Sequence, residues 1–131
     1  MDEISRSLKI VFFINAIAAF IFMFFYLIIP EIYFDLVEGL IFDPYYWRAF
    51  GVTLLILGIF ALRTPLKGES EQAKLMLELA ILWQLAILVL NIWELFALPI
   101  SATYRTTTVF NSAILTVLIV LNAYFYRKEF K

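Results

Sequence analysis

LKIVFFINAIAAFIFMFFYLII, residues 8–29, is the first of several long apolar stretches in this chain. It carries one charge, Lys9, beside its start and one amide, Asn15, among apolar residues. An α-helix needs roughly 20 predominantly apolar residues to cross the hydrocarbon core of a membrane, so the stretch predicts a transmembrane helix. Pro30 follows directly and ends that helix.

Further apolar stretches along the chain predict three more spans, over residues 45–62, 75–98 and 106–126. Their boundaries carry local signals. Asp43 before Pro44 supplies an N-cap and a first-turn proline, Gly68 separates the second span from the third, and Pro99 follows the third. We therefore expect one domain over residues 1–131, an all-α membrane protein built as a four-transmembrane-helix bundle.

The composition supports a membrane location. The mean hydropathy is +0.93, with 64% hydrophobic and 16% charged residues, which leaves too little polar surface for a soluble globule. A net charge of -1 without a basic tract argues against a nucleic-acid partner. The chain has no cysteine and no histidine, so it lacks thiolates and the commonest ligand of haem and zinc. We expect no metal, no cofactor and no catalytic residue.

Positive charges indicate the orientation. Eight of the ten Lys and Arg residues lie at the two ends or around the loop between the second and third spans: Arg6, Lys9, Arg63, Lys67, Lys74, Arg127, Lys128 and Lys131. Basic residues in short loops stay on the cytoplasmic side. The pattern predicts a multi-pass protein of the cell or plasma membrane with both termini in the cytoplasm.

The linker after the first span has a helical pattern of its own. Glu31, Asp35 and Glu38 recur at i, i+4 and i+7, while apolar residues occupy the other faces. We expect a short amphipathic interfacial helix on the outer surface between spans one and two. A solvated face explains the acidic stripe better than contact with a cation or a partner does.

Aromatic residues recur at the predicted outer boundary of the membrane. They are Tyr33, Tyr45, Tyr46, Trp47, Trp93 and Tyr104. Tyr and Trp favour this depth because one end of each ring system is apolar and the other is polar. We interpret the whole set as an interfacial belt.

Polar and small residues fall on one face of each predicted span, which is where a bundle interior is expected. Arg48 shares a helical stripe with Gly51 and Gly58, and this pattern aims it inward. In the third span Gln84 shares a face with Asn91, and Glu94 lies a turn further on. In the fourth the stripe is Thr108, Asn111, Leu115, Leu118 and Asn122.

The candidate ligand-binding residues are Arg48, Asn91, Glu94 and Asn111, because a rise of about 1.5 Å per residue places all four in one outer layer. Three interpretations stay open. In the first, Arg48 pairs with Glu94 in an outward-facing cleft and leaves this pair to bind an anionic headgroup or carboxylate. Alternatively, the pair is structural and the amides bond across helices. In the third, Arg48 snorkels to the interface.

The segment Asp43-Pro44-Tyr45-Tyr46-Trp47-Arg48-Ala49-Phe50-Gly51, followed by Leu54-Leu55 and Gly58, is similar to a group of small four-span bacterial and archaeal membrane proteins that includes DoxX-like domains. A proline closing the first span adds to the resemblance. The resemblance implies a compact four-helix bundle and brings no activity and no functional residues with it.

Two classes of function fit these patterns best. The first is a non-enzymatic accessory or self-associating subunit, whose partners are the lipid bilayer and either another membrane protein or further copies of the chain. The alternative is a lipid or small-molecule binding or transport protein that uses the outward-facing polar cleft. An enzyme would need Glu94 and Arg48 as its acid-base and anion-binding groups.

Overall fold

The computed structural model describes residues 4–130, and within them all regular structure is helical. The elements are α1 (Arg6–Met23), η1 (Phe24–Ile28), α2 (Pro30–Val37), α3 (Pro44–Lys67), α4 (Ser70–Ala97) and α5 (Ala102–Phe130). The segment Arg6–Ile28 and the helices α3, α4 and α5 are each long and apolar enough to cross a membrane. The prediction of an all-α chain with four such helices is confirmed.

Side-chain caps begin the long helices. The Asp43 carboxylate accepts hydrogen bonds from the backbone amides of Tyr45 at 3.0 Å and Tyr46 at 3.3 Å, and Pro44 occupies the first turn of α3 as predicted. Glu69 caps α4 in a reciprocal pair with Gln72. Polar turns continue the helices past the predicted apolar spans, so α3 ends at Lys67 and α5 runs over Ala102–Phe130.

The first apolar stretch ends in a π-helical turn, η1. The Ile29 amide donates to the Phe24 carbonyl at 3.1 Å, five residues back, and Pro30 then begins α2 because it has no amide hydrogen with which to continue α1. The wider turn changes the direction of the side chains around Tyr26.

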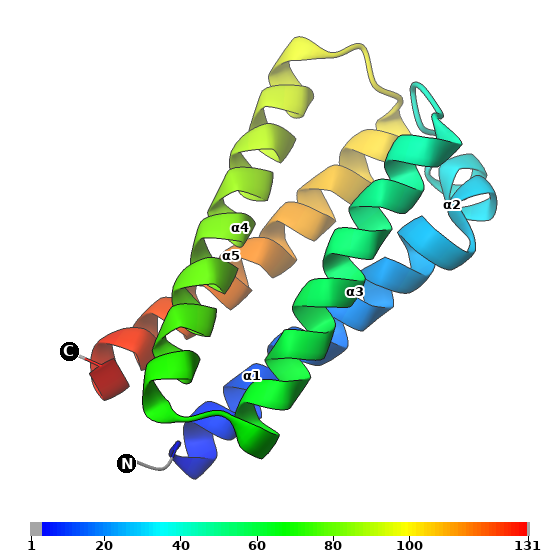
Figure 1. Ribbon diagram of the computed structural model, residues 1–131. Coiled ribbons are helices and arrows are strands. Elements are labelled where there is room, and N and C mark those ends of the chain that lie inside the picture. The colour runs from blue at the N-terminus through cyan, green and yellow to red at the C-terminus, as the bar shows by residue number, and fades with distance from the viewer. Residues whose placement is uncertain (1–3, 131) are drawn as a thin grey trace.

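The helices form two hairpins, α1 with α3 and α4 with α5 (Figure 1). Two glycines of α3 allow the first hairpin to pack closely. A Cβ atom on Gly51 would lie 2.7 Å from the Leu27 Cβ and 2.8 Å from the Leu27 backbone nitrogen, and one on Gly58 would lie 2.7 Å from the Phe20 ring. The predicted glycine stripe is therefore a packing face, and it faces the first apolar segment.

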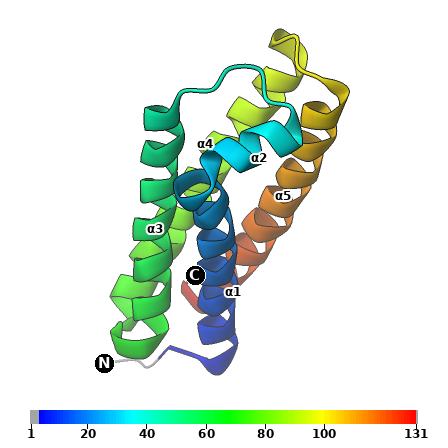
Figure 2. The ribbon, with the colours of Figure 1, turned by 90° about the vertical axis from the view of Figure 1, so that its right-hand side faces the viewer.

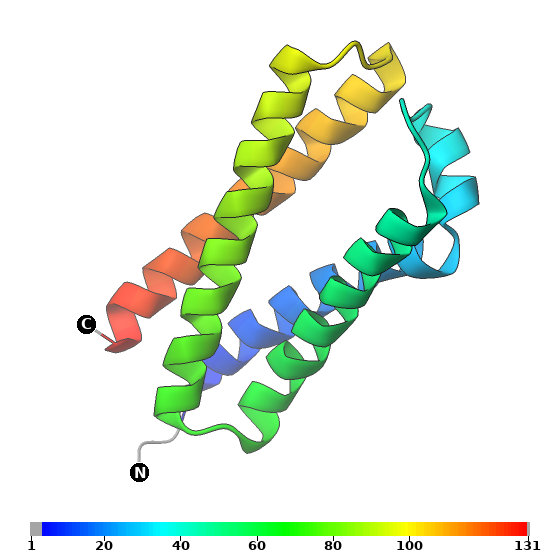
Figure 3. The same ribbon diagram turned by 45° about the horizontal axis from the view of Figure 1, so that its top comes forward.

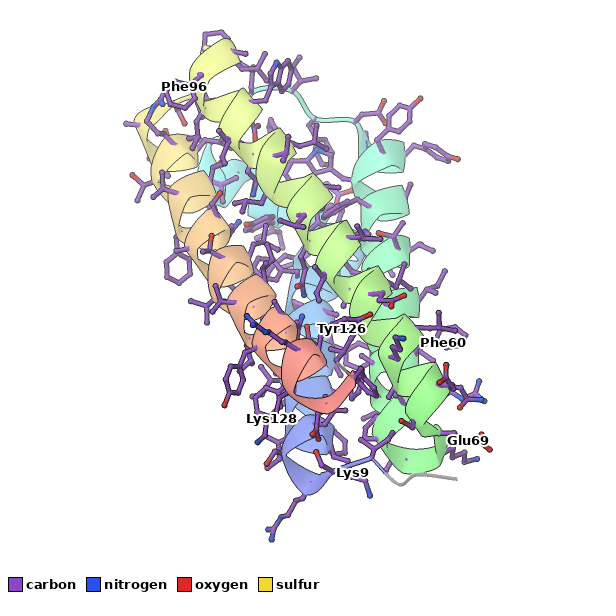
Figure 4. All side chains as sticks on the ribbon, turned by 90° about the vertical axis from the view of Figure 1, so that its left-hand side faces the viewer. Lys9, Phe60, Glu69, Phe96, Tyr126 and Lys128 are labelled. Carbon is purple, nitrogen blue, oxygen red and sulfur yellow. The ribbon has the colours of Figure 1, made fainter. Side chains whose placement is uncertain are left out.

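Both termini lie at one end of the molecule, and the two hairpins separate toward the other end (Figures 1 and 3). At the termini end, α1, α3 and α4 enclose a dry core that includes Leu8, Phe12, Ala61 and Leu77. Figure 4 shows Lys9 and Lys128 near this end and Phe96 near the opposite one. Lys131 lies outside the described residues.

The short helix α2 lies across the far end of the bundle, between α3 and α5 (Figure 2). Tyr33 and Val37 of α2 are buried beneath it, whereas Glu31, Asp35 and Glu38 are exposed. We refer to this as the α2 end of the molecule. At this end α2 thus lies across the space between the hairpins.

We predict that Gly51→Ala destabilises the protein by about 1–3 kcal/mol, because the added methyl group collides with the Leu27 backbone, which has little freedom to move. Equilibrium unfolding in mixed micelles measures this loss. Gly58→Ala is the matched comparison, since its methyl group meets the Phe20 ring, which can turn aside. A Gly51→Ala protein as stable as Gly58→Ala would contradict the packing argument.

Candidate functional site

A cavity of about 130 Å³ lies between the two hairpins and opens partly to the outside. All four long helices and α2 contribute to its wall. The cavity extends from Met76 and Ala61, next to the dry core, to Glu94 and Tyr104 near the α2 end. Along this path the wall is first apolar, then carries the amides of Asn15 and Gln84, then apolar and aromatic side chains, and finally hydroxyl, amide and carboxylate groups.

Three buried amides from three helices, Asn15, Gln84 and Asn122, lie in the inner part of the molecule, and Asn15 and Gln84 line the cavity there. The Asn15 amide nitrogen donates to the Asn122 side-chain oxygen at 2.7 Å, and Asn122 donates back to Asn15 and to Gln84, each at 3.0 Å. Gln84 in turn donates to the Asn15 oxygen at 3.0 Å. All three are buried, and we name this set the amide network. It joins α1 of one hairpin to α4 and α5 of the other.

Aromatic and aliphatic side chains form the middle of the wall. The rings of Phe50 and Trp83 stack from opposite hairpins with their centroids 5.7 Å apart. The Tyr26 ring, placed by the π turn, lies 4.8 Å from Phe50 and 5.1 Å from Trp47 between centroids. A planar or aliphatic group would therefore meet aromatic faces on more than one side.

The α2 end of the wall is polar. Asn91, Glu94 and Asn111 all line it, as do the hydroxyl-bearing side chains of Tyr33 and Tyr104. The Tyr104 hydroxyl lies beside the Glu94 carboxylate, and the Asn111 amide is 3.5 Å from the Tyr33 hydroxyl, the outer limit of a hydrogen bond. Three of the four candidate ligand-binding residues are thus brought together around one space.

Arg48, the fourth candidate, does not line the cavity. Its guanidinium pairs with Glu31 of α2 at 2.8 Å and 3.2 Å, and the two side chains are 42% and 56% exposed. The prediction of an inward-aimed Arg48 paired with Glu94 is wrong. The reason is that the glycine stripe faces α1 and η1, so at its outer end this stripe meets the start of α2 instead of the bundle interior.

The aromatic belt is divided between two environments. Tyr33, Trp47 and Tyr104 line the cavity, whereas Tyr45, Tyr46 and Trp93 are exposed. One signal for the inward tyrosine of α5 was available, because extending the polar stripe of the fourth span back by four residues from Thr108 reaches Tyr104. Nothing comparable points to Tyr26, since the π turn that orients it has no distinct sequence pattern.

No group of three or more His, Cys, Asp or Glu side chains suited to a metal ion is found in residues 4–130. We found no protein family, curated protein or solved structure that matches the chain.

We predict that Asn122→Leu lowers the free energy of unfolding by on the order of 2 kcal/mol, because it removes two hydrogen bonds with Asn15 and one with Gln84 at about 0.6 kcal/mol each. Equilibrium unfolding measures the loss. Asn15→Leu should lower the free energy of unfolding less in the Asn122→Leu protein than in the wild type, because the hydrogen bonds that the two residues share are already lost. Asn111→Leu, on the same helix, is the control with a small expected loss. If the losses of free energy caused by Asn122→Leu and Asn15→Leu are fully additive, the result would argue against a network.

We also predict an acid-sensitive attachment of α2. The pKa of the Glu31 carboxyl is lowered from 4.5 by a hydrogen bond from its own backbone amide and then by Arg48. The Glu31 carboxylate therefore stabilises the fold at pH values above the pKa that it has in the unfolded chain. This stabilisation is lost as the pH falls through its pKa in the folded protein. Melting temperatures measured between about pH 6 and pH 3 should fall less in Glu31→Gln than in the wild type. Asp35→Asn, also on α2, should retain the wild-type slope, and equal slopes in all three proteins would refute the assignment.

Proposed function

We propose that this chain is a multi-pass integral membrane protein that binds a small amphipathic molecule in the cavity between its hairpins. The observation that carries the proposal is the gradient along the cavity wall. Polar groups with free hydrogen-bonding capacity lie at the α2 end, and apolar and aromatic side chains lie behind them. Ligand sites in proteins have this composition, a mostly apolar wall with a few placed polar groups.

The size of the cavity limits the ligand. At about 130 Å³ it is close in size to the cavity of about 150 Å³ that binds benzene in an engineered protein. A single ring or the end of a larger molecule fits, with the remainder leaving through the open side. Asn15 and Gln84 of the amide network line the inner part of the cavity, and Ala61, Met76 and Ala80 line it further toward the termini end.

In our proposal the basic end with both termini faces the cytoplasm, and α2 lies at the outer membrane surface. The polar end of the cavity then faces outward, which gives a ligand access from the outer leaflet or from the aqueous phase. The exposed apolar side chains occur on all four long helices, as contact with lipid requires, and single out no face for another subunit. They favour the binding function over an accessory or self-associating one.

A fluorescence experiment tests the proposal. Trp47 and Trp83 line the cavity, and Trp93 is 56% exposed, so a Trp93→Phe background reports on the cavity alone. We expect 4-bromobenzyl alcohol to quench this fluorescence in a saturable manner. Ala80→Leu, which fills the cavity, should weaken the apparent affinity by roughly tenfold, equivalent to about 1.4 kcal/mol.

Ala86→Leu is the matched control, because Ala86 lies on the same helix, is exposed and does not line the cavity. It should leave the saturable quenching unchanged. Quenching that does not saturate, or that responds equally to both substitutions, would reflect partition of the probe into the detergent and would contradict binding in the cavity.

A further inference from the structure

The Glu94 carboxylate is the one acidic group on the wall of the described cavity. Within residues 4–130 the only ion pair joins Arg48 to Glu31, so no Lys or Arg nitrogen lies within bonding distance of Glu94. Arg105, a neighbour in sequence, donates instead to the Leu95 carbonyl at 2.9 Å. A carboxylate on a membrane-spanning helix is costly unless a cation or hydrogen bonds compensate it.

The groups around Glu94 fit a particular kind of cation. Aromatic rings of Tyr26, Trp47, Phe50 and Trp83 share the cavity with it, and the negative faces of such rings attract ammonium groups. The side chains of Tyr104 and Asn91 add oxygen atoms that accept N–H hydrogen bonds. Calcium and magnesium need six or more oxygen ligands, which one carboxylate among aromatic and aliphatic side chains does not supply.

We propose that the ligand of this cavity is an organic cation, a protonated amine or quaternary ammonium group carried on a small apolar body. This inference rests on the proposed binding function and names its ligand class. The ammonium group lies at Glu94 near the α2 end, and the apolar body extends along Phe50 and Trp83 toward the amide network. The position of Arg48 outside the cavity agrees with this polarity, because an inward guanidinium would repel such a ligand.

Three probes that share one ring and differ in charge test the inference. They are 4-bromobenzylamine, 4-bromobenzyl alcohol and 4-bromobenzoate, titrated near neutral pH into the Trp93→Phe protein in an uncharged detergent. We expect the amine to bind more tightly than the alcohol and the alcohol more tightly than the benzoate. Glu94→Gln keeps the shape of the side chain and removes its charge. In this variant the affinity for the amine should fall roughly tenfold to the level of the alcohol, whose own affinity should not change.

Asp35→Asn is the matched control, since it removes one negative charge at the α2 end without touching the cavity. It should retain the preference for the amine. An amine that binds no more tightly than the alcohol in the wild type, or a Glu94→Gln protein that retains the preference, would overturn the inference. The wild-type comparison decides the matter even if Glu94→Gln does not fold.

Failure of this inference is distinguishable from failure of the proposed function. Saturable, Ala80→Leu-sensitive binding of the alcohol without a preference for the amine would leave a binding protein whose ligand is not a cation. If none of the three probes gives saturable quenching, both the ligand class and the binding function are refuted. A preference for the benzoate would reverse the assigned polarity of the cavity.

Discussion

The amide network is the interaction on which the rest of the structure depends. Helices in a membrane gain little by burying apolar surface against one another, because lipid tails are as apolar as leucine. The hairpin of α1 and α3 is held by close packing at Gly51 and Gly58, but few tertiary contacts join the two hairpins. Asn15, Gln84 and Asn122 join the hairpins by hydrogen bonds, beside the apolar contacts of the dry core and the Phe50–Trp83 stack. Both amide hydrogens of Asn15 and of Asn122 are used.

The network lies between the dry core and the polar end of the cavity. On its inner side, Leu8, Phe12 and Leu77 pack without exposure to solvent. The cavity passes the network and continues toward the α2 end, where the hairpins separate and α2 lies across the bundle. The polar groups of the cavity lie near that end.

Much of this arrangement follows from patterns that lipid and helical geometry impose. Lengths of apolar sequence predict the four long helices, and the capping role of Asp43 follows from its place before Pro44. The helical period predicts the stripe from Thr108 to Asn122, and its members do face the cavity or the network. The rise per residue of a helix also predicts that Asn91, Glu94 and Asn111 lie at the same depth along the bundle. These predictions succeed because each depends on a single helix.

Predictions that depend on which helix faces which neighbour are less successful. The period places Arg48 on the glycine stripe correctly, but it does not say that this stripe faces α1, η1 and α2. Tyr33 has the composition of an interfacial belt, and only the path of α2 turns it inward, whereas the inward position of Tyr104 follows from the stripe that includes Thr108. Tyr26 depends on a π turn, a local adjustment to Pro30 that no periodicity predicts.

The amide network is built only from carboxamides, and this choice has a consequence for how the protein responds to its surroundings. A transmembrane voltage does work on charges, about 2.3 kcal/mol per elementary charge per 100 mV, and it does none on a neutral network that carries no net charge. Carboxamides also do not titrate, and their bonds inside the bundle are not screened by salt. The junction of the two hairpins is thus indifferent to membrane energisation, acidity and ionic strength, unlike the exposed ion pair that holds α2.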